Sequence, residues 1–224
     1  MNKLLAFIRL DFITIKPYLT IKNLFILLLV IIALSINNTV GGILIGIVMM
    51  FALLYAAYPF AVGEKNGIDQ LYSTLPVSRR SIVLGRYGFV VALVAVGGIA
   101  SCILLFIWQT VLQRAFNLQE ALLTTLALFA IYTFFQAIQL PIYFKLGYAK
   151  AKFLAYLPFA LFPLTTIAIG SRFTDADWIG LLETVVIWIV NHQLFAVVIG
   201  VVSWLAMMAI SCLLSLRFYK KREF

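Results

Sequence analysis

Long apolar runs dominate this sequence and constrain its fold more than any other feature. The 224 residues are 64% hydrophobic and 11% charged, with a mean hydropathy of +1.09. A soluble protein carries roughly 25% charged residues to cover its surface. The composition therefore excludes a water-facing globule and indicates an all-α integral membrane protein. Helices are expected because each satisfies its own backbone polar groups in lipid, and the short alternating segments of a transmembrane barrel are absent.

Six apolar runs are predicted to cross the membrane, and they form a single transmembrane domain covering residues 1–224. A bilayer core asks for about 20 apolar residues per helix, and the first run is short by this measure. The fifth contains Pro158 and Pro163, which should kink or locally unwind it. The six predicted spans cover residues 22–37, 41–62, 87–111, 121–143, 153–170 and 194–216.

The segment 171–193 is predicted to stay on the outer side as an interfacial or re-entrant helix. Its apolar part, residues 178–190, is too short for a span and contains Glu183. Basic residues support this topology, because Lys and Arg favour the cytoplasmic side. With six spans and both termini inside, only Arg114 and Arg172 of the 17 Lys and Arg lie outside. A seventh crossing would place the basic C-terminal residues outside.

Residues 1–21 are too polar to span and predict an amphipathic helix lying along the inner leaflet. Apolar side chains recur at helical spacing on one side, including Leu5, Ile8 and Phe12, while Arg9 falls on the other. Basic residues on the polar side suit anionic headgroups. Pro17 should end this helix.

Chemistry-bearing motifs are missing from the chain. It has no GxxxxGK[ST] phosphate loop, no HExxH and no GxSxG. His192 is the only histidine, so metal-ligand spacing is absent too. No acidic residue is expected at mid-membrane depth. Ion-coupled transporters usually place acidic or other ionisable side chains there. We expect no enzyme activity, no bound metal and no cofactor in this chain. If the chain transports a cargo, a separate subunit should supply the energy for transport.

Residues 63–86 form the longest polar interruption, and the charge pattern places them in the cytoplasm. Ile68, Leu71, Tyr72 and Leu75 have the spacing of a short amphipathic helix that Pro76 stops. Ser78 is expected to cap a following helix that begins near Arg79. Such a short helix could dock into a groove of a soluble partner, or the segment could be only a solvated loop.

This arrangement resembles a known family. The N-terminal amphipathic helix, the six spans, the outer helix and the loop EKNGIDQLYSTLPVSRRSIVLGRY at residues 64–87 resemble the permease subunits of ABC-2 type exporters. The likeness is greatest to the compact branch that contains bacitracin-resistance permeases and the exporter of phenol-soluble modulins. The resemblance implies a bacterial plasma membrane protein that pairs with a second permease, identical or paralogous. It also implies an ABC ATPase subunit, in two copies, that binds ATP and Mg.

The resemblance also implies roles for particular residues. The loop after the second span would hold the coupling helix at about residues 68–76, which inserts into the ATPase. An inner gate helix would match residues 1–16, and the second and fifth spans would line the path. The residues assigned in this way are Glu64, Ile68, Leu71, Tyr72, Leu75, Pro76, Arg79, Arg80 and Arg86 for coupling, Leu5, Ile8, Arg9 and Phe12 for the gate helix, and Pro158 and Pro163 for the path.

The expected function is ATP-driven export of an amphipathic or hydrophobic cargo, such as peptides or antimicrobials, by alternating access. Two alternatives remain open from the residues. One is a substrate-binding membrane subunit of a vitamin importer, which would hold a tight small-molecule ligand. The other is a membrane immunity protein that acts by binding alone and needs no ATPase. No nucleic-acid partner is expected, because the basic residues lie at the ends of apolar runs.

Overall fold

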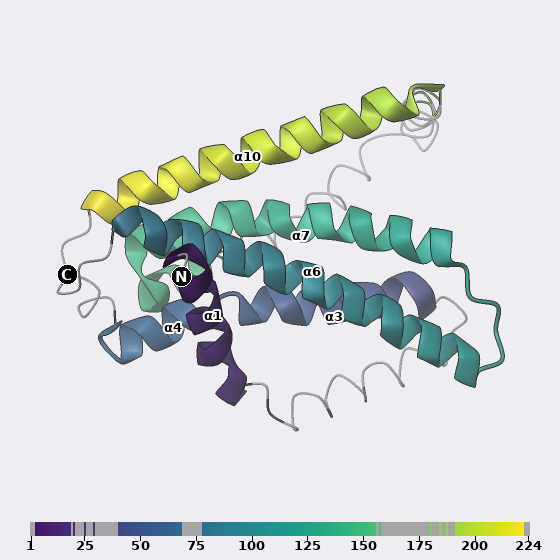
Figure 1. Ribbon diagram of the computed structural model, residues 1–224, viewed down its shortest axis with the longest axis horizontal. Coiled ribbons are helices and arrows are strands. Elements are labelled where there is room, and N and C mark those ends of the chain that lie inside the picture. The colour runs from purple at the N-terminus through teal and green to yellow at the C-terminus, as the bar shows by residue number, and fades with distance from the viewer. Residues whose placement is uncertain are drawn as a thin grey trace.

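The structure is a computed structural model of the chain, and each element it describes is helical (Figure 1). It describes residues 3–18, 40–68, 78–155 and 191–221, with single positions at 20, 25, 29, 157, 180, 184 and 187. The elements are α1 (Lys3–Ile15), the 3-10 turn η1 (Lys16–Tyr18), α3 (Val40–Tyr55), α4 (Tyr58–Lys65), α6 (Arg79–Val111), α7 (Leu118–Leu146) and α10 (Gln193–Lys221).

Four candidate membrane spans lie in the part of the chain that the structure describes. They cover Leu44–Lys65, Arg79–Val111, Leu118–Leu146 and Phe195–Lys221. Each overlaps one of the predicted spans, so four of these predictions are confirmed as apolar helical segments long enough to cross a membrane. The predicted spans 22–37 and 153–170 and the outer helix 171–193 fall mostly outside the described residues, and the count of six stays a prediction.

Helix α6 begins well before the span predicted for it. It starts at Arg79 and runs for 33 residues, about 50 Å at 1.5 Å per residue, against a hydrocarbon core of about 30 Å. Ser78 is its N-cap, because the Ser78 hydroxyl accepts a hydrogen bond from the backbone N–H of Ser81 at 3.1 Å. The predicted cap and helix start are therefore confirmed, and residues 79–86 of the 63–86 segment are helical.

The second predicted span is present, but not as one continuous helix. A turn at Ala56 and Ala57 separates α3 from α4. Pro59 lies in the first turn of α4, where its missing N–H cannot continue the α3 hydrogen-bond pattern and its ring would crowd the Tyr55 carbonyl. The prediction of a continuous span over residues 41–62 is wrong at this point, and Pro59 is the sequence signal that marks the break.

The spans lie side by side, and their ends define a base. Helix α6 begins, and α7 and α10 end, at the same end of the bundle, where α1 crosses the others and α4 lies nearby (Figure 1). We call this end the base. A buried cluster gathers here from all of these helices and includes Phe60, Phe89, Leu140 and Tyr143. A second buried cluster, including Ile45 and Leu105, joins α3, α6 and α7 toward the opposite end.

A proline in α7 helps to join α7 to α10 and α6. Pro141 has no N–H, so the Ala137 carbonyl one turn earlier loses its usual partner. The hydroxyl of Ser211 on α10 donates to that carbonyl at 2.5 Å. The Tyr87 hydroxyl on α6 lies 2.6 Å from Ser211 Oγ and 2.8 Å from Ser215 Oγ. Since Ser211 uses its proton on Ala137, the proton between Tyr87 and Ser211 must come from Tyr87.

Candidate functional site

Helix α1 packs directly on the first turns of α6, and two glycines make this approach close. A Cβ added at Gly85 would lie 2.6 Å from the Cβ of Phe7, and one added at Gly88 would lie 2.8 Å from Ile8 Cδ1. The rings of Phe12 and Phe89 meet edge to face, with centroids 5.0 Å apart. The N-terminal helix is therefore part of the base as well as a candidate for the membrane surface.

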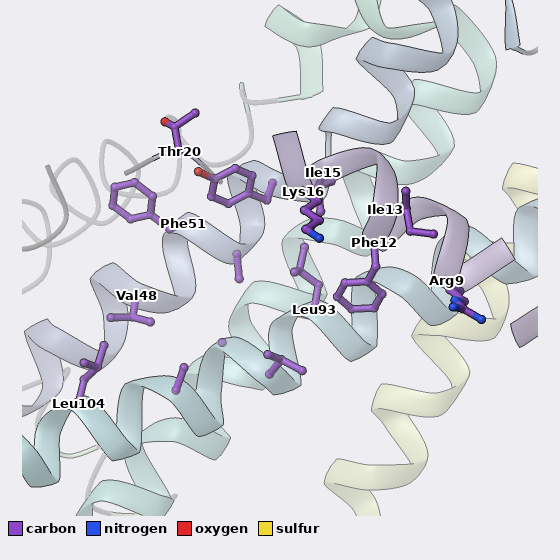
Figure 2. A pocket seen from close by; sticks show the side chains of 15 residues that line it. Arg9, Phe12, Ile13, Ile15, Lys16, Thr20, Val48, Phe51, Leu93 and Leu104 are labelled. Atoms are coloured by element: carbon purple, nitrogen blue, oxygen red, sulfur yellow. The ribbon is translucent and has the colours of Figure 1, made fainter. Parts of the chain in front are cut away.

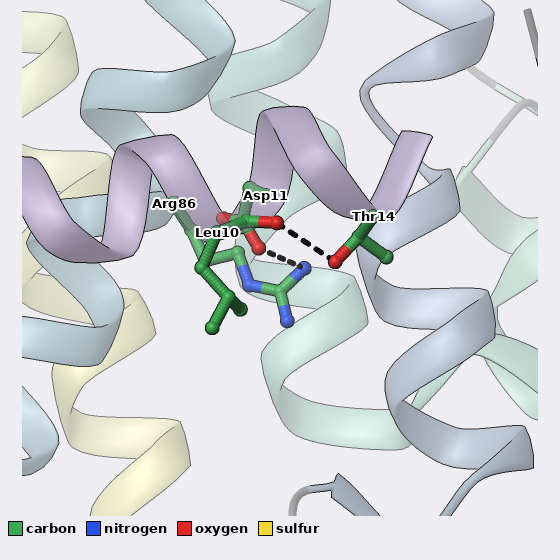
Figure 3. A network of polar contacts seen from close by, with 4 residues as sticks. All are labelled: Leu10, Asp11, Thr14 and Arg86. Atoms are coloured by element: carbon green, nitrogen blue, oxygen red, sulfur yellow. Dashed lines mark hydrogen bonds and ion pairs between the residues drawn. The ribbon is translucent and has the colours of Figure 1, made fainter. Parts of the chain in front are cut away.

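A buried ion pair joins the same two helices. Asp11 Oδ1 lies 3.4 Å from Arg86 Nη1, and the two side chains are 3% and 6% exposed (Figure 3). Burial raises the pKa of the Asp11 carboxyl to about 6, and the Arg86 guanidinium opposes this rise. The carboxylate thus depends on Arg86 for compensation of its charge. Figure 3 also shows the Thr14 hydroxyl bonded to the Leu10 carbonyl, which leaves Thr14 out of the ion pair.

Phe60 on α4 connects this ion pair to α7. Its ring lies under the Arg86 guanidinium, 4.6 Å from centroid to Cζ, a distance that permits a cation–π interaction. The same ring stacks on Tyr143 at 5.1 Å and meets Phe144 edge to face at 5.1 Å. One aromatic side chain thus contacts α6 and the last two turns of α7.

Glu64 connects α4 to the helical segment that follows α7. Helix α7 ends at Gly147, whose φ of 76° lies in the left-handed region, and residues 148–155 are helical again. The Glu64 carboxylate oxygen Oε2 accepts hydrogen bonds from the backbone N–H groups of Tyr148 and of Ala149, the latter at 3.0 Å. A carboxylate at a helix N-terminus satisfies free N–H groups and complements the helix dipole.

Arg79 connects the start of α6 to the end of α10. Its Nη1 donates to the Lys220 carbonyl at 2.7 Å and to the Tyr219 carbonyl at 3.4 Å. These carbonyls lie in the last turn of α10, where carbonyl groups lack partners within the helix and attract cations. The ring of Tyr219 meets Phe144 of α7 edge to face at 5.4 Å. The base therefore joins α1, α4, α6, α7 and α10 through named side chains.

Comparison with known proteins decides the family. The pattern described as an ABC-2 family transporter protein matches residues 6–220, nearly the whole chain. The chain belongs to the ABC-2 family of transporter proteins. It is thus a membrane permease subunit of an ABC transporter, and membership implies a partnering ABC ATPase subunit in general. No curated protein and no solved structure matches the chain.

The residues assigned to coupling in this ABC-2 permease lie partly at the base. Glu64, Arg79 and Arg86 make the contacts described above, Arg80 is exposed, and Ile68 is half-buried against the basal cluster. The assignments to Leu71, Tyr72, Leu75 and Pro76, and those to Pro158 and Pro163, lie outside the described residues.

The assigned gate-helix residues are distributed around α1. Ile8 and Phe12 are half-buried against the base, Arg9 is exposed, and Leu5 is 60% exposed although the sequence places it on the apolar side. The sequence analysis gave Asp11 no role, yet Asp11 occupies the buried face of α1. Its signal is an acidic residue at i+3 from Ile8, within the apolar periodicity.

A pocket of about 540 Å³ lies between α1, α3 and α6 of the permease (Figure 2). Its walls are mainly apolar and include Val48, Phe51 and Leu93, while Arg9 and Lys16 contribute the two cationic side chains that line it. Such a lining suits an apolar group with a polar or anionic end. No group of three His, Cys, Asp or Glu that could hold a metal occurs among the described residues.

Proposed function

We propose that this permease is one of two membrane subunits of an ATP-driven exporter, in which a separate ABC ATPase supplies the energy. The second permease is identical or paralogous, and each permease sits on one ATPase subunit. ATP and Mg bind in the ATPase, and the permease itself catalyses no reaction. Closure of the ATPase pair moves the coupling elements, and the spans then open a cavity alternately inward and outward.

The observation that carries this proposal is the bonding of both flanks of the 63–86 segment to other helices. Glu64 on the first flank bonds the segment after Gly147, and Arg79 on the second flank bonds the end of α10. A force applied between these flanks would therefore reach several spans at once. This arrangement supports the assignment of residues 68–76 as the coupling helix, which the family resemblance suggests.

The charge distribution supports a cytoplasmic base. The other described basic residues lie on α1 or within a few turns of the ends of the helices that meet there, whereas Arg114 lies in the turn at the opposite end, between α6 and α7. Lys and Arg are retained on the cytoplasmic side of membranes. We therefore place both termini and the 63–86 segment in the cytoplasm, with six spans and an outer helix at 171–193. The basic residues at the base are Lys3, Arg9, Lys16, Lys65, Arg79, Arg80, Arg86, Lys145, Lys150, Lys152, Arg217, Lys220 and Lys221.

The cargo that we propose is an amphipathic or hydrophobic molecule, such as a peptide or a lipid-like antimicrobial. The pocket beside α3 supports this class, because its walls are apolar and its cations could meet an anionic or carboxylate end. By resemblance to the compact branch of bacitracin-resistance and phenol-soluble-modulin permeases, the second and fifth spans would line the path. Pro158 and Pro163 would let the fifth span bend during the cycle.

The test is transport in sealed vesicles that contain the permease and its partner ABC ATPase. The proposal predicts co-purification of the two proteins and ATP-dependent accumulation of an amphipathic peptide inside inside-out vesicles. An ATPase variant that cannot hydrolyse ATP serves as the control. A permease that purifies alone and changes no peptide distribution would contradict the proposal and favour a binding protein.

A further inference from the structure

Glu64 lies where two polar segments of the chain meet. It is exposed in the last turn of α4, at the entrance to the 63–86 segment, and its carboxylate accepts two backbone N–H groups at residues 148 and 149. Those N–H groups belong to the first turn of the helical residues 148–155. A hydrogen bond to a charged carboxylate is stronger than one between neutral groups, so this contact holds the two segments together directly.

Gly147 interrupts the helix beside the residues that Glu64 binds. Its backbone is left-handed, with φ at 76°, and it separates α7 from the helical residues that follow. The Gly147 N–H still bonds the Tyr143 carbonyl, but helical hydrogen bonding does not run unbroken through this point. Glycine moves between backbone regions at low cost. The position of the helix after Gly147 relative to α7 therefore depends on its packing against the basal cluster and on the Glu64 hydrogen bonds at its first turn.

An aromatic row runs beside the Glu64 contact. Phe60 of α4 stacks on Tyr143, and Tyr143 stacks on Tyr148 with centroids 5.9 Å apart. Helix α4 thus contacts the chain on both sides of the Gly147 break. Phe60 contacts α7 before the break, and Glu64 contacts the helix after it. The helix that starts after the break also packs against the basal cluster through Tyr148, Ala151 and Ala155, and the Glu64 hydrogen bonds hold its first two N–H groups.

We propose that Glu64 is the positioning residue that passes movement of the coupling segment to the helix beginning at Tyr148, so that the two cytoplasmic segments move as one body. This inference rests on the proposed function for its transport step. On this proposal, the hydrogen bonds between Glu64 and the helix that begins at Tyr148 persist through the whole transport cycle. The adjacent Lys65, which is exposed and one position along, has no such role.

The first arm of the test measures the contact itself. Amide hydrogen exchange is followed in the full permease in nanodiscs, for the wild type, Glu64→Ala and the control Lys65→Ala. Glu64→Ala should speed exchange at residues 148–150 by about 2- to 30-fold, the range expected for loss of a helix cap. Glu64→Gln, which keeps an acceptor without the charge, should fall between. Unchanged protection in Glu64→Ala would overturn the proposal whatever the permease transports.

The second arm measures transmission in the complex with the ATPase. Glu64→Ala should keep assembly and ATP hydrolysis but lower cargo moved per ATP by a similar factor. A Glu64→Cys, Ala149→Cys pair, with Cys102 and Cys212 replaced by Ala, should regain coupling when a short thiol cross-linker joins the two positions. The proposal would be overturned if Glu64→Ala moved as much cargo per ATP as the wild type. It would also be overturned if cross-linking the two cysteines blocked transport. A wild-type complex without ATP-driven transport would overturn the proposed function, and the exchange arm would still decide the contact.

Discussion

The Asp11 carboxylate lies 3.4 Å from the Arg86 guanidinium, and neither side chain is more than 6% exposed. Helices α1 and α6, which are distant in sequence, are thus joined by a buried ion pair. Arg86 also covers Phe60, so the pair connects α1 to α4 as well as to α6. Movement at the base therefore affects the N-terminal helix.

The two partners of this pair should respond differently to neutralisation. Arg86→Met leaves a buried carboxylate uncompensated and should lower the free energy of unfolding by about 3 kcal/mol. Asp11→Asn removes the carboxylate whose charge burial disfavours and keeps Phe60 under the Arg86 guanidinium, so it should lower the free energy of unfolding by less than about 1 kcal/mol. Thermal unfolding of detergent-purified protein measures both. The Asp11→Asn, Arg86→Met double variant should be more stable than Arg86→Met alone, and equal stability would contradict a direct interaction.

The Asp11 pKa predicts a pH dependence of stability. Burial raises this pKa from 3.8 to about 6, so between these values the folded protein holds a proton that the unfolded chain has lost. This carboxyl therefore lowers stability as pH rises from about 4 to 6, by at most about 3 kcal/mol, and adds no further change above that window. Subtracting the Tm curve of Asp11→Asn from that of the wild type isolates the effect. A flat difference across the window would show that Asp11 is not buried as described.

Alanine at Gly85 should displace α1. The new Cβ would lie 2.6 Å from the Phe7 Cβ, which is fixed to the α1 backbone, and overpacking of this kind costs about 1–3 kcal/mol. Gly88→Ala should cost less, because the Ile8 methyl that it meets can rotate away.

Gly200→Ala in α10 is the matched control for this series, because the structure places nothing within 4 Å of its Cβ. Alanine there should be neutral or stabilising by up to about 1 kcal/mol. Tm measures stability, and proteolysis within α1 measures its release. Equal effects at Gly85 and Gly200 would contradict the close packing of α1.

The hydroxyl chain between α6, α10 and α7 should contribute to stability. Ser211→Ala leaves the Ala137 carbonyl without its donor, since Pro141 supplies none, and an unsatisfied buried group costs about 1–3 kcal/mol. Tyr87→Phe removes both hydrogen bonds to the α10 serines and should lower the free energy of unfolding by a similar amount. Ser203→Ala is the control, because that hydroxyl bonds only its own helix, at Gly200. Similar Tm losses at Ser203 and Ser211 would argue against the chain.

Local signals in the sequence predicted part of this structure correctly. The cap at Ser78 and the helix start at Arg79 follow from short-range chemistry, and the positions of four spans follow from apolar run length. The contacts of Asp11 with Arg86 and of Glu64 with the segment after Gly147 depend on helix packing, which no local pattern specifies. Pro59 and Pro141 carry a local signal of interrupted hydrogen bonding. Which donor replaces the missing one, such as Ser211, depends again on tertiary structure.

The central claim is that force from an ATPase enters this permease through residues 68–76, and ATP-coupled transport by loop variants tests it most directly. Leu71→Asp or Tyr72→Asp would place a charge on the proposed docking face and should lower transport by about 10- to 100-fold, corresponding to about 1.4–2.8 kcal/mol. Leu112→Asp, in the turn at the opposite end of α6, should leave transport near the wild-type value. Wild-type assembly, hydrolysis and transport in the two loop variants would contradict the account.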